Sequence, residues 1–228
     1  MESLSFAEKV QSFYEKMTPP LNLPSGVSAI NSYENLESRK YFITFLKDYF
    51  TDNNKRVLVL GINPGRFGSG VTGVPFTDPI ALIEKCGIEN DLPKRRELSS
   101  EFIYSFIDTW GGAKKFYKNF FLSAVSPIGF TKDNVNYNYY DDSELFVSVK
   151  PFILQTLRQQ YDFGVKNTCV LLGTGKNQKL FSEMNKELRL FKKVYAVEHP
   201  RYIMQYQRKN IEKYLDKYTE VFTQALSH

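Results

Sequence analysis

The sequence predicts an α/β protein, a three-layer α/β/α sandwich around a central, mainly parallel, four-stranded sheet. Four short apolar runs rich in β-branched or aromatic residues have the composition of buried strands. Longer segments with helical spacing lie between these runs, and each run leads into turn residues. Because strands that alternate with helices are typical of a parallel sheet covered on both faces, the pattern favours this class. The predicted strands are residues 56–60, 120–125, 168–172 and 193–197.

Seven segments have helical spacing. Four lie between or beside the strands, at residues 79–86, 100–110, 142–161 and 175–191. Two precede the first strand, at residues 6–17 and 33–50, and one follows the last strand, at residues 206–226. Pro151 lies inside one of them and is expected to kink or split that helix, because proline lacks the N–H of a helical hydrogen bond. Residues 19–26 and 87–99 are predicted loops, and the second contains the basic cluster Lys94-Arg95-Arg96.

The length of 228 residues suits one domain spanning 1–228, since a single core grows to roughly 250 residues before chains tend to divide. Within it, residues 1–52 form N-terminal helices and residues 55–210 form the α/β core. We see no internal repeat and no low-complexity tract.

The scarcity of two residue types excludes several chemistries. The chain has two histidines and two cysteines, whereas a cysteine-ligated zinc or iron–sulfur site needs about four protein ligands. Cys86 and Cys169 cannot supply them even with a histidine added. His228 is the last residue and is expected to fray. We therefore expect no metal or other cofactor, and His199 is the candidate catalytic histidine.

The composition also bears on compartment and partners. The first residues show neither a basic nor an apolar leader region, no run reaches the ~18 apolar residues of a spanning helix, and two unpatterned cysteines favour a reducing compartment. These features predict a cytoplasmic protein without a membrane partner, which we take to be a monomer. The net charge of +5 and pI near 9.0 permit a polyanionic partner such as a nucleic acid.

Two segments carry the strongest signals, and both follow predicted strands, where open α/β sheets bind ligands. The first is Gly61-Ile62-Asn63-Pro64-Gly65-Arg66-Phe67-Gly68, continued by Thr72-Gly73-Val74-Pro75-Phe76. It matches neither the phosphate-loop nor the dinucleotide-binding pattern, which disfavours a nucleotide-triphosphate enzyme and a dehydrogenase. The second is Glu198-His199-Pro200, at the end of the last strand.

Together these segments resemble the uracil-DNA glycosylase superfamily, and specifically its single-strand-selective monofunctional branch, with a bacterial relative as the expected match. The resemblance extends over roughly two-thirds of the chain, from about residue 56 to 210, and leaves the N-terminal helices outside it. It implies hydrolysis of the N-glycosidic bond of uracil or a related deaminated or oxidised base in DNA. Such a reaction belongs to base excision repair and leaves an abasic site.

The resemblance implies two catalytic residues. His199 would donate a hydrogen bond to the base O2, where negative charge develops as the bond breaks, and Asn63 would orient the attacking water. An amide accepts a hydrogen bond but takes no proton, so the reaction should be strongly dissociative. The base would be rotated out of the stack into a pocket. By the same resemblance, the substrate-binding residues are Ile62, Gly65, Phe76, Ser126 and Asn136.

Three of these have distinct implied roles. Phe76 would stack on the base. Gly65 stands where related families carry a bulky residue that rejects thymine, so it leaves room for uracil and some 5-substituted uracils. Asn136, with Asn134 as the runner-up, would form paired hydrogen bonds with the base edge.

The resemblance implies that DNA contacts a rim of positively charged residues together with one aromatic residue. Lys176 opens a helix whose N-terminus could hold a phosphate. After His199-Pro200 the chain departs from the family pattern and continues as Arg201-Tyr202-Ile203-Met204. Tyr202, Ile203 or Met204 would fill the gap left by the base. The DNA-binding residues are predicted as Arg66, Lys176, Arg201, Tyr202 and Arg208.

Two alternatives remain open at this stage. One is a nucleic-acid-binding protein that keeps the fold without catalysis, which the presence of Asn63 and His199 disfavours. The other is a hydrolase of free nucleosides. Calcium-dependent enzymes of that kind need several aspartates near the first strand, and Asp78 is the aspartate that its following loop offers.

Overall fold

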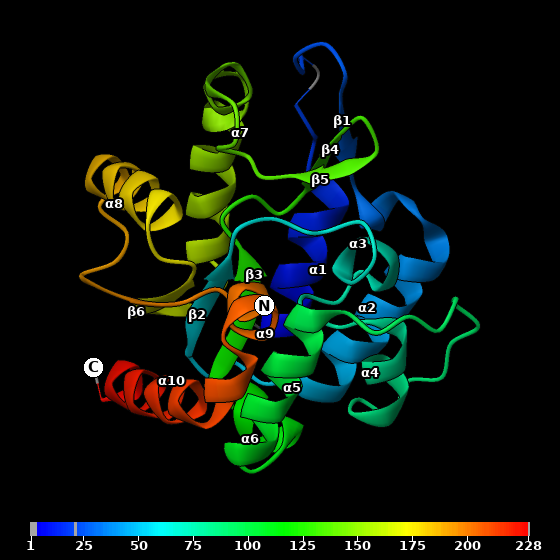
Figure 1. The fold of residues 1–228 in the computed structure, drawn as a ribbon, viewed down its shortest axis with the longest axis vertical. Coiled ribbons are helices and arrows are strands. Elements are labelled where there is room, and N and C mark those ends of the chain that lie inside the picture. The colour runs from blue at the N-terminus through cyan, green and yellow to red at the C-terminus, as the bar shows by residue number, and fades with distance from the viewer. Residues whose placement is uncertain (1–3, 21, 228) are drawn as a thin grey trace.

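The computed structural model describes residues 4–20 and 22–227, so His228 lies outside the described residues. A four-stranded parallel sheet forms the centre, in the order β3-β2-β6-β7 (Figure 1). Its strands are β2 (Arg56–Gly61), β3 (Phe120–Ala124), β6 (Val165–Leu172) and β7 (Lys193–Val197). The predicted fold class and all four predicted strands are confirmed, with small shifts at their ends.

Strand β2 is the buried centre of the sheet. All six of its residues are buried, and it pairs with β3 on one side and β6 on the other. A strand covered on both faces needs apolar side chains throughout rather than in alternation, which explains the run Val57-Leu58-Val59-Leu60. The parallel pairing brings the carboxyl ends of neighbouring strands to the same edge of the sheet.

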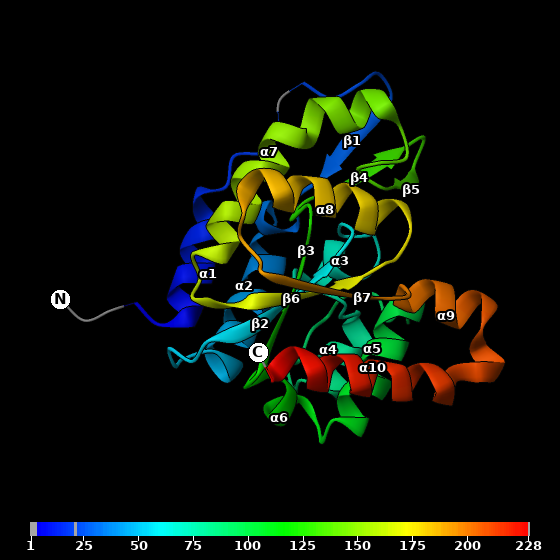
Figure 2. The ribbon, with the colours of Figure 1, turned by 90° about the vertical axis from the view of Figure 1, so that its left-hand side faces the viewer.

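Helices cover the two faces of the sheet, and neighbouring residues of β3 show how the faces are divided. Phe121 contacts Phe6 of α1 (Phe6–Lys16) and Phe163 just after α7 (Ser143–Tyr161). Phe120 points to the opposite face, because successive strand side chains alternate, and it contacts Phe222 of α10 (Ile211–Leu226). Figure 2 shows α7 and α8 above the sheet, with α5, α6 and α10 below it.

The remaining elements connect this frame. Their bounds are η1 (Ser32–Glu34), α2 (Leu36–Tyr49), α3 (Ser69–Thr72), α4 (Pro79–Glu84), α5 (Leu98–Thr109), α6 (Ala113–Tyr117), α8 (Lys176–Leu188), α9 (Pro200–Tyr206) and η2 (Arg208–Asn210). The predicted helix 33–50 therefore divides into η1 and α2, and the one predicted for 206–226 divides into η2 and α10. Helix α9 is not among the predicted helices.

Helix starts follow the capping rules. Ser5 forms a capping box with Glu8 at the start of α1, and Asp142 accepts backbone N–H bonds at the start of α7. Helix α7 runs unbroken through Pro151, so of the two predicted outcomes, a kink or a split, the split does not occur. The neighbours Phe152 and Ile153 are buried, and this packing offsets the missing backbone bond.

A second, antiparallel sheet of three strands is absent from the sequence prediction. It has the order β1-β4-β5, with β1 (Val27–Ile30), β4 (Gly129–Lys132) and β5 (Val135–Tyr137). The strands have three or four residues, too few for periodicity to stand out. The turn between β4 and β5 contains Asp133 and Asn134, both with positive φ, as expected for the residue types that tolerate this conformation.

Within the described residues, no helix is long and apolar enough to cross a membrane. Cys86 and Cys169 are both buried and unbridged. The Cys86 thiol lies 3.0 Å from the Tyr104 hydroxyl, inside the core.

Arg56 is a buried cation at the start of β2. Its side chain has no exposed surface, and its guanidinium lies 4.9 Å from the ring centre of Phe6 and 4.8 Å from that of Phe50. The guanidinium donates to the Tyr117 carbonyl at 2.7 Å and to the Asp52 carboxylate at 2.8 Å. These bonds join the start of the central strand to the segments before β2 and before β3.

We expect Arg56→Met to lower the free energy of unfolding by about 3 kcal/mol, because the Tyr117 carbonyl and the Asp52 carboxylate lose their partner. Urea denaturation followed by circular dichroism measures the change. Lys55→Met is the matched control, since Lys55 is exposed, and it should change stability by less than about 0.5 kcal/mol. Equal effects of both substitutions would contradict this role for Arg56.

Candidate active site

A pocket of about 310 Å³ lies at the carboxyl edge of the parallel sheet, near the lower limit of typical small-molecule sites. Segments that follow three strands line it: Asn63 lies after β2, Pro127 after β3, and His199 after β7. The structure therefore brings together residues far apart in the sequence. Of the predicted site residues, the lining contains Ile62, Asn63, Gly65, Phe76, Asn136, His199, Arg201 and Tyr202.

The Asn63 amide is held in one orientation by backbone groups. Its Nδ2 donates to the Tyr137 carbonyl at 3.2 Å, and its Oδ1 accepts from the Tyr139 N–H at 3.0 Å. An amide oxygen has two acceptor sites, so Oδ1 keeps one for a further donor. The Tyr139 hydroxyl in turn donates to Asn177 at 2.8 Å, which fixes this segment against the start of α8.

His199 caps helix α9. Its Nδ1 accepts from the Arg201 N–H at 3.2 Å, so the proton of the neutral ring lies on Nε2. Burial, together with the nearby Arg201 charge, lowers the pKa of His199 to about 4. At neutral pH the imidazole is therefore uncharged and presents one N–H donor.

Phe76 lies close to both the backbone of β2 and His199. A Cβ added at Gly61 would come within 2.5 Å of the Phe76 ring, so the ring rests directly on the glycine at the end of β2. The centres of the Phe76 and His199 rings are 6.1 Å apart. Phe76 has φ 54°, a conformation rare for an aromatic residue and one often kept at functional sites.

Asn136 lines the pocket opposite Gly65. Its Oδ1 accepts from the Arg66 N–H at 3.0 Å, and its Nδ2 lies 3.2 Å from where a Cβ on Gly65 would stand. Asn136 is predicted to form paired hydrogen bonds with the base edge. One of the two acceptor sites of its Oδ1 is already occupied by the Arg66 N–H. The runner-up, Asn134, is exposed in the β4–β5 turn and does not line the pocket.

Ser126 does not reach the pocket, contrary to its predicted role. The residue is fully buried, and its hydroxyl donates to the Ile128 carbonyl at 2.8 Å. Its N–H bonds the Ile62 carbonyl at 3.1 Å. Ser126 thus supports the loop after β2 from behind.

Helix α9 forms the rim, and burial separates the three candidate wedge residues. Ile203 and Met204 are buried, whereas Tyr202 is 44% exposed and lines the pocket. The ring centres of Tyr202 and Tyr206 are 5.6 Å apart on the exposed side of α9. Of the three, Tyr202 alone can contact a nucleic acid here.

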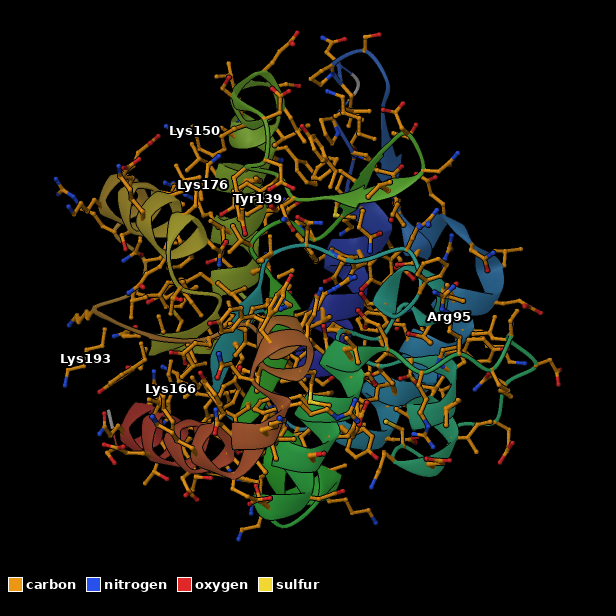
Figure 3. The ribbon with its side chains drawn as sticks, in the orientation of Figure 1. Arg95, Tyr139, Lys150, Lys166, Lys176 and Lys193 are labelled. Carbon is orange, nitrogen blue, oxygen red and sulfur yellow. The ribbon has the colours of Figure 1, made fainter. Side chains whose placement is uncertain are left out.

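The other residues predicted to contact DNA differ in which neighbouring groups of the protein their positively charged side chains contact. Lys176 is exposed at the start of α8, near Tyr139 in Figure 3, with its ammonium 5.6 Å from the Tyr140 ring centre. Arg66 stacks on Phe67. Arg208 does not line the pocket, and its Nη2 forms an ion pair with Glu101.

The basic cluster of residues 94–96 is engaged with neighbouring groups. Arg95 stacks on the Phe67 ring at 3.7 Å, Arg96 pairs with Glu84, and Lys94 donates to Asn90. Figure 3 shows Arg95 far from Lys176, on the other side of the molecule. The side chains of this cluster are therefore stacked on, or bonded to, neighbouring residues of the protein.

Several lining residues escaped the sequence analysis. Tyr14 of α1, Ser32 and Tyr33 of η1 come from the N-terminal part, which the motifs do not include. Glu97, just before α5, also lines the pocket. Burial raises the pKa of Glu97, and the charge of Arg201 opposes that rise. No local pattern marks any of the four. Among the described residues, no group of three or more His, Cys, Asp or Glu side chains is placed to hold a metal ion.

At the carboxyl edge of its parallel sheet, this α/β protein has a pocket lined by the fixed Asn63 amide, the His199 imidazole and the Phe76 ring. The family model of the uracil DNA glycosylase superfamily matches residues 47–223. The chain belongs to this superfamily, which confirms the resemblance seen in the motifs and supports a uracil-DNA glycosylase-type hydrolase.

A solved structure gives a more detailed comparison. The crystal structure of wild-type Pedobacter heparinus SMUG2 is 42% identical in sequence, with a TM-score of 0.93, over 97% of this chain and 98% of that chain. The similarity thus includes the N-terminal elements, beyond the family model. No curated protein matches the chain.

We expect His199 to titrate with a pKa near 4, well below the ordinary value of about 6.5, because burial disfavours the charged ring. Histidine ¹⁵N chemical shifts should show a neutral ring with the proton on Nε2 at pH 7. Since the chain has two histidines, His228→Gln isolates the signal. In the unfolded chain, His199 binds its proton at a higher pH than in the folded protein. The contribution of the neutral His199 ring to the free energy of unfolding is therefore complete above about pH 6.5 and is lost as the pH falls toward 4. Titration near 6.5 would contradict this environment.

Gly61→Ala should displace the Phe76 ring, because the new methyl group meets it at 2.5 Å. We expect the fold to persist, since the contact is with the outer end of a side chain, and kcat/KM for base excision to fall at least 10-fold. Gly87→Ala is the control: Gly87 has open space around it but a positive φ, so that change affects stability alone. A crystal structure of the variant with Phe76 unmoved would contradict the expectation.

Proposed function

We propose that this protein is a monofunctional DNA glycosylase that hydrolyses the N-glycosidic bond of uracil, or of related deaminated or oxidised bases, in DNA and leaves an abasic site. The observation that carries the proposal is the placement of Asn63 and His199 in one pocket beside Phe76. Each polar side chain is oriented by backbone hydrogen bonds. Such preorganisation supports catalysis, because no reorientation is needed as charge develops.

The reaction separates charge. As the bond between the base nitrogen and the sugar C1′ breaks, its electron pair stays with the base and the sugar becomes cationic. A water oxygen then bonds C1′ and its proton passes to solvent, while the base anion is protonated on release. The protein must stabilise the anion and hold the water, and a pocket with a small set of fixed polar groups suits both tasks.

His199 is proposed to stabilise the leaving base. Its Nε2–H is the free donor of the ring, since Nδ1 is bound to the Arg201 N–H. A neutral donor lowers the energy of the anion without transferring a proton to it. The pKa of about 4 keeps this donor present throughout the neutral range.

Asn63 is proposed to hold the water. Its Oδ1 keeps one acceptor site after bonding the Tyr139 N–H, and its orientation cannot reverse without breaking the Nδ2 bond to Tyr137. The amide can align a water O–H but cannot remove its proton. The mechanism therefore depends mainly on stabilising the leaving group.

The pocket suits a flat base. Phe76 would stack on its face, and Gly65 leaves space that a side chain would take from Asn136. The Nδ2 of Asn136 is available to donate to the base edge. These features support uracil and 5-substituted uracils as substrates.

The DNA surface is proposed to lie around the rim of the pocket. Arg201 and Tyr202 border the opening, and Lys176 with the start of α8 offers a phosphate contact. Tyr202 would fill the gap in the duplex when the base is rotated out. Since Arg208 is paired with Glu101, it adds less than the sequence alone suggested.

The two alternatives are less well supported. Asp78, the aspartate that a calcium-dependent nucleoside hydrolase would use, is buried, and its carboxylate caps α4 and accepts the Glu97 N–H. An inactive binding protein has no need of the fixed amide and the neutral imidazole.

A labelled oligonucleotide containing one uracil tests the proposal in the presence of EDTA. We expect strand cleavage only after alkali, as for a metal-free enzyme that leaves an abasic site. His199→Ala and Asn63→Ala should each lower the single-turnover rate at least 100-fold, because each removes a group that acts in the transition state. Free deoxyuridine should remain intact.

Lys150→Ala is the control, since Lys150 pairs with Glu187 outside the pocket and should leave the rate unchanged. DNA binding without abasic sites would support the inactive alternative. Cleavage of free deoxyuridine that EDTA abolishes would support the nucleoside hydrolase.

A further inference from the structure

The chain is rich in aromatic residues, and almost all of their side chains are covered by the rest of the protein. Tyrosine, phenylalanine and tryptophan make up 15% of the sequence. Within residues 4–20 and 22–227, only two of these side chains are exposed, Tyr202 at 44% and Tyr206 at 65%. Both belong to the short helix α9, and both line the pocket. The two most exposed aromatic rings of the described chain therefore lie together at the rim of the site.

The exposed aliphatic side chains have no such relation to the pocket. In the described part of the chain, four large ones are between 54% and 75% exposed, and none of them lines the pocket: Leu4, Leu36, Val135 and Val147. Single exposed apolar residues of this kind are common on protein surfaces. Two adjacent tyrosine rings at the mouth of a pocket are different, because tyrosine is enriched where proteins bind partners. Their position indicates that they contact the substrate.

Helix α9 holds these rings on a fixed support. Figure 2 shows the helix at the outer edge of the molecule, and its inner side is anchored by the buried Ile203 and Met204. Tyr202 and Tyr206 are one turn apart and share the outer side, with ring centres 5.6 Å apart and ring planes at 46°. Among the described residues, Tyr206 has no other ring contact, and its hydroxyl has no hydrogen bond. The Tyr206 ring is therefore largely uncovered and is not part of the core.

The size of the pocket places the neighbouring nucleotides at this rim. A volume of about 310 Å³ suits a single base rather than a base with its sugar and phosphates. The sugar of the extruded base therefore stays at the opening. The next base of the strand follows closely, since stacked bases are roughly 3.4 Å apart. Arg201, which is exposed on the same helix, adds a positive charge that attracts the phosphates.

We propose that Tyr206 stacks on a base that flanks the excised one, with the Tyr202 ring beside it on the same face of α9. Every base has a π face, so stacking holds the strand without reading its sequence. The inference rests on the proposed function and adds to it a residue that binds the nucleotide next to the substrate base. Tyr206 would hold the strand outside the pocket while Asn63 and His199 act inside it.

Single-stranded oligonucleotides with one uracil test the inference when the bases beside the uracil are removed one at a time. One oligonucleotide keeps both neighbours, and two others carry a tetrahydrofuran abasic analogue on the 5′ or the 3′ side. We expect Tyr206→Ala to lower kcat/KM roughly 5-fold or more on the first, the smaller end of the effect of losing one base–aromatic stack. On one of the two oligonucleotides that lack a neighbour, the loss should be less than about 2-fold. Comparing both proteins on each substrate cancels the effect of the analogue on the reaction itself.

Further substitutions separate stacking from a structural role. Tyr206→Phe keeps both ring faces and should stay within about 2-fold of the wild-type protein on all three oligonucleotides. Tyr206→Leu keeps an apolar contact with Tyr202 but has no π face, so it should behave like Tyr206→Ala. Val147→Ala is the matched surface control and should change nothing, because Val147 is 72% exposed on α7 and does not line the pocket. Melting curves confirm that each variant folds.

Three results would overturn the inference. Tyr206→Ala could lower kcat/KM equally on all three oligonucleotides, or leave it unchanged, and in both cases the ring stacks on no flanking base. If Tyr206→Leu keeps the wild-type kcat/KM, Tyr206 only supports Tyr202. In each of these cases the wild-type protein still excises uracil, so the proposed function stands. If the wild-type protein excises no uracil from the oligonucleotide with both neighbours, the proposed function itself fails.

Discussion

The site depends on one constraint, the parallel pairing of β2 with β3 and β6, and of β6 with β7. Because parallel strands end at the same edge, the segments that follow them converge although they are far apart in the chain. Asn63 and His199 meet for this reason. The burial of all six β2 residues makes that edge rigid, so side chains beyond it are held by a fixed frame rather than by mobile loops.

Hydrogen bonds within the site then decide which chemical form each group takes. The backbone at Tyr137 and Tyr139 fixes the Asn63 amide, and the Arg201 N–H fixes the tautomer of His199. Burial keeps this imidazole neutral at physiological pH. A neutral donor and an aligned acceptor suit a reaction in which the leaving base becomes an anion and the attacking water needs orientation more than activation.

Most of the central fold was predictable, since its elements have strong local patterns. The four parallel strands and the helices around them follow from apolar runs and helical spacing. Short or non-local features were missed: the three-stranded sheet, helix α9, and the continuity of α7 through Pro151. Each depends on packing partners distant in sequence, which no local pattern contains.

The sequence by itself determined the fold class and the family, because ordered motifs require particular residue types at fixed spacing. From the same motifs it predicted Asn63, Phe76 and His199 as site residues, and the three line one pocket. Only the tertiary structure decided which other side chains reach the pocket. It excluded Ser126, whose hydroxyl is bonded in the interior, and it added Tyr14 from the N-terminal helix. The physical reason is that burial and hydrogen-bond partners depend on contacts between distant segments, and these exist only once the chain is folded.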